Sequence, residues 1–111
     1  MTREQVNLMM ESIGLPYAYY QFTKDTAKAP PFVCFFYTGD DDVIADNSNY
    51  QSIEKLRVEL YADYKDFESE ALIEDAFVKN QLVWDKDETF IDSEKLYMTV
   101  YESEVIINEQ K

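Results

Sequence analysis

The sequence predicts a single α+β domain, in which a mainly antiparallel sheet of about five strands is covered by two helices on at least one side. Two segments have the apolar spacing of amphipathic helices, and several others are rich in alternating β-branched and aromatic residues. The order is helix, three strands, helix, two strands. The sequence shows no repeat and no linker, so we expect residues 1–111 to share one hydrophobic core.

The first helix is expected over residues 2–13. Thr2 and Gln5 have the spacing of a capping box, and Gly14 supplies a stop. Between them, apolar residues recur at positions i, i+3, i+4 and i+7. The pattern predicts a helix that buries one face, made of Val6, Met9, Met10 and Ile13.

Three strands are expected next. The aromatic-rich segment 17–22 follows a proline break, and the β-branched and aromatic run 32–38 follows a pair of prolines. From Ile53 onward, apolar and polar residues alternate with the period of a strand that has one face inward. Residues 39–52, between the second and third strands, are acidic and polar, and we expect a long connection there.

The second half of the chain predicts one helix and two strands. Asp66 is a suitable N-cap, and acidic residues in the first turn and a basic residue in the last turn complement the helix dipole. We expect a short strand over residues 82–84, an acidic turn over 85–88 and a long final strand over 96–107. The apolar phase changes within the final strand, which predicts a bulge or an exchange of faces near residues 102–104.

Charge and composition exclude several classes of function. The chain has 23 acidic and 10 basic side chains, a net charge of −13 and no histidine. So negative a surface repels nucleic-acid backbones and anionic membranes. Catalytic triads with histidine cannot be built, and two glycines cannot supply a P-loop or a dinucleotide-binding motif. No pair of carboxylates stands out by its spacing, so we expect neither an enzyme nor a cofactor.

The remaining reactive residues have simpler interpretations. Cys34 lies in an apolar run and is expected to be a buried hydrophobic residue rather than a nucleophile. Acidic residues of segment 39–52 offer oxygen ligands for calcium, but the EF-hand spacing is absent, and we favour a solvated acidic segment with no metal site. Most of the nine tyrosines fall in predicted strands, where they serve the core or a subunit interface. No apolar stretch approaches a membrane span and no basic, hydrophobic leader is evident, so we expect a cytoplasmic protein without a membrane partner.

Four segments together resemble the small tail-completion and tail-terminator proteins of long-tailed bacteriophages and prophages of Gram-positive bacteria. The resemblance covers most of the chain, roughly residues 13–107, in the order of the elements as well as in the local sequence. The segments are IGLPYAYYQF at 13–22, PPFVCFFY at 30–37, LRVELY at 56–61 running into DFE at 66–68, and SEKLYMTVY at 93–101.

The resemblance implies a fold like that of the lambda tail terminator and a structural, non-catalytic function. Proteins of this class form a hexameric ring on the head-proximal end of the tail tube. The ring stops polymerisation of the tail tube protein and offers a surface to the head-completion protein, while DNA passes through without specific binding. The resemblance therefore places the protein in the host cytoplasm during assembly and then in the virion tail. Head closure or another step of tail assembly would leave the same pattern.

A ring of this kind needs two different patches on each subunit. We expect strand edges and the segment 39–52 to supply them, because a long acidic loop can reach a lysine or arginine of a neighbour. The candidate contact residues are Asp40, Asp41, Asp42, Asp46 and Tyr50.

The competing hypothesis is an acidic DNA mimic that occupies the basic groove of a nucleic-acid-binding host protein. A mimic presents rows of carboxylates at the spacing of phosphates. In this sequence the acidic residues largely alternate with basic or apolar ones, as at Arg57, Val58 and Glu59. The tail-assembly interpretation is preferred for this reason.

Overall fold

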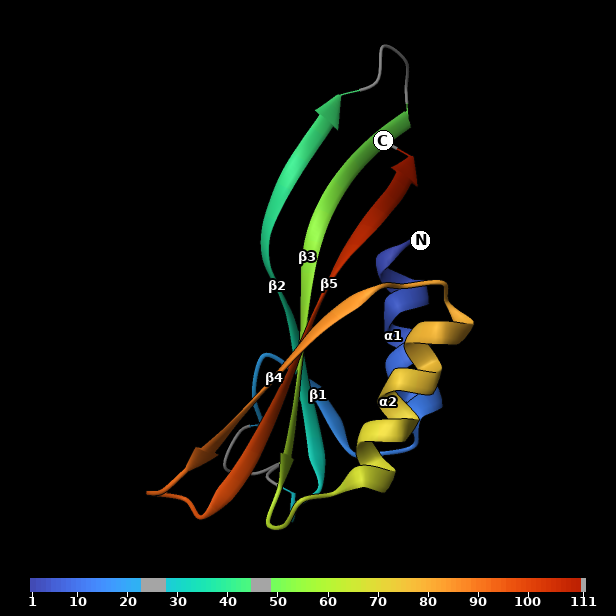
Figure 1. The fold of residues 1–111 in the computed structure, drawn as a ribbon. Helices are drawn as coiled ribbons and strands as arrows, with labels where there is room; N and C mark the ends of the chain where they lie inside the picture. The colour runs from blue at the N-terminus through green and yellow to red at the C-terminus, as the bar shows by residue number, and fades with distance from the viewer. Residues whose placement is uncertain (23–27, 45–48, 111) are drawn as a thin grey trace.

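The computed structural model contains a five-stranded sheet with two helices packed on one face (Figure 1). It describes residues 1–22, 28–44 and 49–110, and within these the side chains of all residues except 40–44, 49–51 and 109–110. The predicted α+β class and order of elements are confirmed. The elements are α1 (Arg3–Ile13), β1 (Tyr17–Tyr19), β2 (Phe32–Ile44), β3 (Asn49–Ala62), α2 (Phe67–Lys79), β4 (Trp84–Ile91) and β5 (Leu96–Gln110).

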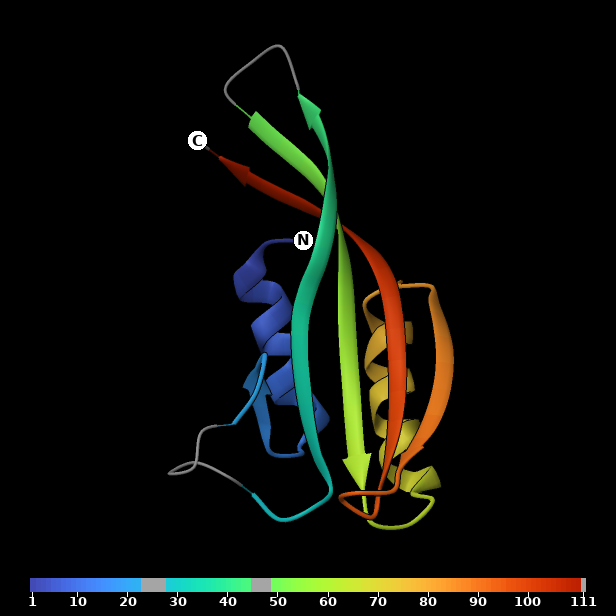
Figure 2. The same cartoon turned by 90° about the vertical axis from the view of Figure 1, so that its left-hand side faces the viewer.

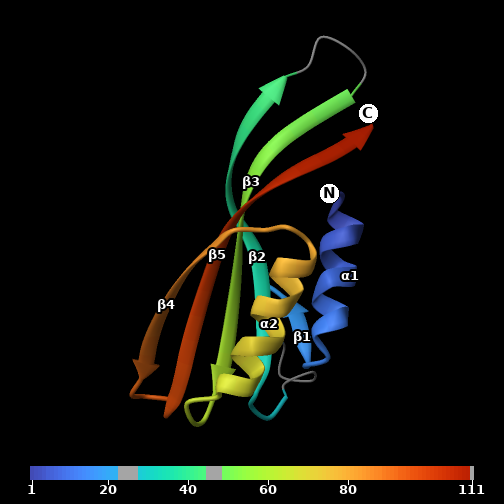
Figure 3. The same ribbon diagram turned by 45° about the vertical axis from the view of Figure 1, so that its right-hand side comes forward.

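The strands lie in the order β1-β2-β3-β5-β4. All neighbouring pairs are antiparallel except β1 and β2, which run parallel. Both helices pack on the same side of the sheet (Figures 2 and 3). We call this side the helix face and the opposite side the helix-free face.

Local capping interactions begin and end the helices where the sequence predicts. The Thr2 side chain accepts the N–H of Gln5 at 3.1 Å, and the Gln5 side chain accepts the N–H of Thr2 at 2.9 Å. Gly14 ends α1 in the left-handed conformation, with φ of 86°. Asp66 caps α2 by accepting the N–H of Ser69 at 3.0 Å. Neither described helix is long and apolar enough to cross a membrane.

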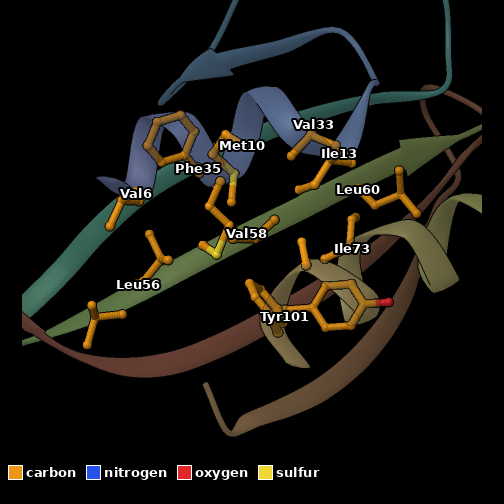
Figure 4. Packing of buried hydrophobic residues seen from close by; sticks show 14 of the residues in the cluster. Val6, Met10, Ile13, Val33, Phe35, Leu56, Val58, Leu60, Ile73 and Tyr101 are labelled. Atoms are coloured by element: carbon orange, nitrogen blue, oxygen red, sulfur yellow. The ribbon is translucent and has the colours of Figure 1, made fainter. Parts of the chain in front are cut away.

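The hydrophobic core lies between the two helices and the helix face (Figure 4). Leu56 and Val58 of β3 have no exposed surface, and the buried ring of Tyr101 meets that of Phe77 at 5.7 Å between centroids. Burial of this apolar area is the main favourable contribution to folding. The cluster consists of Val6, Met9, Met10, Ile13, Val33, Phe35, Leu56, Val58, Leu60, Ile73, Ala76, Phe77, Tyr101, Val105 and Ile107.

The first strand is shorter than the predicted segment 17–22. β1 ends at Tyr19, and Tyr20 turns the chain with φ of 70°. The aromatic residues beyond the strand pack on the helix-free face, where Tyr20 meets Phe36 with ring centroids 5.0 Å apart. The aromatic residues of segment 17–22 therefore belong partly to a strand and partly to the turn that packs against the sheet.

The predicted connection over residues 39–52 is wrong for most of its length. β2 and β3 continue through it and pair from Gly39↔Lys55 to Ile44↔Tyr50, after a register shift between Tyr37 and Gly39. Gly, Asp and Asn disfavour strands only weakly. Here β3 is paired with β5 over its whole length, so backbone pairing overrides that preference. Residues 45–48 of the predicted connection lie outside the described residues.

The predicted strand 82–84 and turn 85–88 are also wrong, because β4 begins at Trp84 and includes the acidic residues. β4 is an edge strand whose side chains are largely exposed. On its helix face, Lys86 and Glu88 form ion pairs instead of apolar contacts. The apolar alternation by which a strand is usually predicted is therefore missing.

The final strand has no bulge near residues 102–104. Its register with β3 is continuous from Asn49↔Gln110 to Ala62↔Tyr97. Odd-numbered residues from Tyr101 onward lie on the helix face, whereas Val100 lies on the helix-free face and is nevertheless 7% exposed. The apparent change of phase arises because β5 is buried on both faces at this point.

Two lysines join α2 to β4 and its surroundings. The carboxylate of Glu70 is 3% exposed, and it lies 2.7 Å from the Nζ of Lys65 and 2.6 Å from the Nζ of Lys86. Lys86 also contacts Glu74 at 2.8 Å, and the Tyr101 hydroxyl donates to the same Glu74 oxygen at 2.8 Å. Burial tends to raise the pKa of Glu74, but the hydrogen bonds from Lys86 and Tyr101 outweigh it and lower that pKa below its ordinary value.

Removing both lysines leaves the Glu70 carboxylate buried without a cation. We expect Lys65→Ala combined with Lys86→Ala to lower the free energy of unfolding by about 3 kcal/mol, since an uncompensated buried charge is costly. Urea unfolding followed by circular dichroism measures the loss. Adding Glu70→Gln replaces the charge by a neutral amide and should restore most of the stability. Equal stability of the double and triple variants would contradict this account.

Candidate functional site

Four of the five predicted contact residues lie in one hairpin. Asp40, Asp41 and Asp42 belong to β2, and Tyr50 belongs to the facing part of β3. Asp46 lies outside the described residues, as do the side chains of the other four. The structure therefore brings the backbones of these four residues together near the outer end of the sheet.

This outer end is a three-stranded arm, made of residues 39–44, 49–55 and 103–110. It extends beyond the N-terminal end of α1, and the molecule measures 50 × 29 × 23 Å (Figures 1 and 2). The β2 edge of the arm has no neighbouring strand in the described part of the chain, because β1 pairs only as far as Phe35. On the other edge, the Met1 amino group donates to the carbonyl of Ile106 at 3.0 Å, and the Met1 carbonyl accepts the N–H of Asn108 at 2.8 Å.

A partly buried ion pair fastens the arm to α1. Glu54 of β3 is 6% exposed, and one terminal nitrogen of Arg3 lies 2.8 and 2.6 Å from its two carboxylate oxygens. The guanidinium also lies 5.5 Å from the centre of the Tyr37 ring, where the arm begins. A buried carboxylate needs such a cation, so the arm depends on this contact for its attachment to the helix.

The helix-free face has a hollow of about 500 Å³ at the end away from the arm. Glu59 lies within it and is 8% exposed. Its carboxylate accepts the Nε–H of Arg57 at 2.7 Å and the hydroxyl of Tyr61 at 2.9 Å. The hollow is lined by Tyr20, Gln21, Phe22, Lys28, Phe32, Cys34, Phe36, Glu59, Tyr61, Glu94 and Leu96.

The groups in this hollow favour packing rather than catalysis. Burial, and then the negative charge of Glu59, raise the pKa of the Cys34 thiol from 9.0 to about 11. Burial and the hydrogen bond to Glu59 also raise the pKa of Tyr61. Both groups stay protonated near neutral pH and are poor nucleophiles. The aromatic walls offer a surface for apolar or aromatic groups instead.

Toward the arm, the helix-free face becomes acidic around a second hollow of about 400 Å³. Glu102 of β5 stands opposite Arg57 of β3 in the sheet register. In the same way, Glu104 stands opposite Lys55. The adjacent edge strand adds Asp85 and Asp87 without adding a cation to this face, so the face carries a net negative charge.

The tyrosines divide between the core and the surface. Tyr101 is fully buried, whereas Tyr17, Tyr19 and Tyr20 are 37%, 55% and 61% exposed. Core packing accounts for Tyr101. The exposed rings at β1 have the composition that is typical of protein interfaces.

Comparison with known proteins gives no family for this chain: no protein-family model and no curated protein sequence matches it. The described side chains also include no group of three or more cysteine, aspartate and glutamate residues placed to hold a metal ion. The arm, the acidic helix-free face and the strand edges are therefore the features from which a function has to be inferred.

The attachment of the arm can be tested by removing its cation. Arg3→Ala leaves the buried Glu54 carboxylate without its partner, and we expect the free energy of unfolding to fall by about 2 kcal/mol. Amides of the arm in β3 should also exchange faster with solvent in hydrogen-exchange NMR. Arg3→Ala with Glu54→Gln is the matched control and should recover much of both losses. Unchanged exchange in the arm of the single variant would contradict the role given to Arg3.

The Cys34 thiol should react slowly in the folded protein. At pH 8, a pKa of about 11 instead of 9.0 leaves about a hundredfold less thiolate, and burial hinders the reagent further. We expect alkylation by iodoacetamide, followed by mass spectrometry, to be at least about a hundredfold slower in native protein than in urea. The native rate should rise as the pH approaches 11. Rates within about tenfold of each other would show that the thiol is neither buried nor shifted.

Proposed function

We propose that this chain is a structural subunit of a phage tail, a tail terminator that caps the tail tube and provides the surface to which the head joins. The three-stranded arm is the observation that supports this proposal most. Its strands continue beyond the helices that cover the rest of the sheet (Figure 1). Val105 and Ile107 at its base belong to the core, whereas the β2 backbone edge farther out has no neighbouring strand in the described part of the chain. The four sequence segments that resemble tail-completion proteins favour the same class.

A ring of identical subunits requires two different patches on each subunit, because its contacts run head to tail. We place the arm in the first patch, with Asp40, Asp41, Asp42 and Tyr50 on or beside its open β2 edge. The second patch has to attract these carboxylates. Apart from Lys86, which is ion-paired to α2, the exposed lysines of the described residues are Lys28, Lys55, Lys79 and Lys95.

The acidic helix-free face suits a wall past which DNA moves. Carboxylates at Asp85, Asp87, Glu102 and Glu104 repel phosphates and do not release counterions as a DNA-binding surface does. In the proposed ring this face is directed toward the channel. DNA would then pass without being held.

The alternative of a DNA mimic receives less support. A mimic needs continuous rows of carboxylates, whereas basic residues stand beside the row here. In the sheet register, Glu102 stands opposite Arg57, which is ion-paired to Glu59, and Glu104 stands opposite Lys55. Among the described side chains of this face, Asp85 and Asp87 of β4 have no basic residue opposite them in the register. The tail-assembly proposal needs no such rows.

The proposal predicts a hexamer whose formation depends on the acidic residues of the arm. Size-exclusion chromatography with light scattering, over a wide concentration range, should give the mass of six subunits. Replacing Asp40, Asp41 and Asp42 with asparagine removes three charges from the first patch and should shift the equilibrium toward smaller species. Glu4→Gln, Glu11→Gln and Asp75→Asn remove the same charge from exposed helix positions and should leave the mass unchanged.

Repeating the mass measurement in high salt and with assembled tail tubes distinguishes the possible outcomes. Loss of the hexamer in high salt would agree with a charged interface, and its persistence would place the contacts on apolar surface. An unchanged hexamer in the triple asparagine variant removes the three aspartates from the interface. A chain that stays monomeric both alone and with assembled tail tubes contradicts the tail-terminator proposal.

A further inference from the structure

We propose that the outer edge of β4, together with an exposed apolar stripe on α2, binds an extended basic segment of another protein as an added strand. In strand addition, an extended peptide forms main-chain hydrogen bonds along a free sheet edge, and pockets beside the edge bind its alternate side chains. This surface lies on the opposite edge of the sheet from β2, and the inference does not depend on the proposed tail function.

The register shows which backbone groups are available at this edge. Met1 bonds to Ile106 and Asn108 on the side of β5 away from β3, so the even-numbered residues of β5 direct their backbone groups to that side. Those residues pair with the odd-numbered residues of β4. The even-numbered residues from Trp84 to Phe90 therefore direct their N–H and C=O groups outward, where no described strand pairs with them.

One of these outward N–H groups already has a local partner. The N–H of Glu88 donates to the Asp87 carboxylate at 2.9 Å. An incoming strand has to release this contact before it can pair there. A lysine or arginine opposite Asp87 does so by attracting the carboxylate, whereas an acidic strand does not. The outer edge of β4 is therefore more accessible to a basic segment than to an acidic one.

The apolar stripe lies on a flank of α2 that is one step round the helix from the residues that contact β4. Phe67 and Val78 are 71% and 63% exposed, and Ala71 and Glu74 lie between them at helical spacing. On the side toward the sheet, Glu70 and Glu74 both contact the β4 residue Lys86. A strand added about 4.8 Å beyond β4 would place alternate side chains beneath this flank. Apolar residues at those positions would bury the stripe.

Charge identifies the occupant as basic. The cations nearest to this edge, Lys65 and Lys86, are already shared among the carboxylates of Glu70, Glu74 and Glu88. Asp85 and Asp87 have no ion pair with any described residue. They lie on the helix-free side of β4, so the partner needs lysine or arginine on that side and apolar residues on the other.

A second copy of this chain does not meet this requirement through its own β4, which is acidic, or through the β2 edge of its arm. The β2 edge carries Asp40, Asp41 and Asp42. Pairing it with β4 would bring acidic residues against Asp85 and Asp87, and like charges on paired strands repel. The occupant is therefore a strand of a different protein, with lysine or arginine alternating with apolar side chains.

A designed peptide tests the edge directly. The probe is an acetylated and amidated peptide of about seven residues that alternates valine and lysine, added to the isotope-labelled full-length protein and followed by NMR. We expect saturable shifts of the amides of Lys86, Glu88 and Phe90, together with the side chains of Phe67 and Val78. Binding should weaken as salt is added. A peptide with glutamate in place of lysine, and a lysine peptide with alternate backbone nitrogens methylated, should each bind at least about tenfold more weakly.

A matched pair of variants isolates the backbone. Glu88→Ala and Glu88→Pro remove the same side chain, but only proline removes the outward N–H, and proline is tolerated where that group faces away from the sheet. We expect the proline variant to bind the lysine peptide about tenfold more weakly than the alanine variant.

The proposal is overturned if the two variants bind equally, if the glutamate peptide binds as well as the lysine peptide, or if shifts are absent from β4. If the proline variant does not give a native spectrum, the methylated peptide decides the question on the unaltered protein. Equal binding of the methylated and unmethylated peptides would then overturn strand addition.

Discussion

The ladder between β3 and β5 is the constraint on which the rest of this structure depends. It runs from Asn49↔Gln110 to Ala62↔Tyr97 without a register shift. Because side chains alternate between faces, an unbroken register keeps the helix face apolar over the core and allows the helix-free face to be charged. The same ladder carries both strands past the end of α1, and β2 follows β3 into the arm. The core, the arm and the acidic face are therefore set by one pairing.

The two edges of the sheet are stabilised by different means. On the side of the arm, α1 is attached to the inner strand β3 through Arg3 and the buried Glu54. At the opposite edge, β4 is held by its ladder to β5 and by ion pairs of Lys86 with α2. Both edges carry acidic residues, which discourages uncontrolled pairing of sheet edges. A protein with such edges can join selected neighbours and still avoid sheet-to-sheet aggregation.

The parts of the fold that follow from local signals are predictable from the sequence, and the parts that follow from distant pairing are not. Helix α1 follows from the capping box at Thr2 and from its apolar spacing, and the inner part of β3 follows from alternation. The outer part of the arm and β4 are rich in polar residues and lack apolar alternation, so their strands are determined by the backbones beside them. One signal for the arm's attachment was present in the sequence, because Glu54 shares the alternating phase of Leu56 and Val58. An acidic residue in an apolar phase indicates a buried ion pair, but Arg3, its partner, is too distant in sequence to be identified by pattern.

The unbroken β3 and β5 ladder also shapes how the chain can fold. The residues paired in it lie roughly 35 to 61 positions apart along the chain, whereas β2 and β3 are joined by one hairpin. Loop closure makes such distant pairing slow, so β2 and β3 can associate before β5 arrives. Until then, the inner edge of β3, with its apolar residues from Leu56 to Leu60, is open to another chain. Docking of β5 covers this edge, so the strand that is most protected in the native sheet depends on the last strand of the chain for that protection.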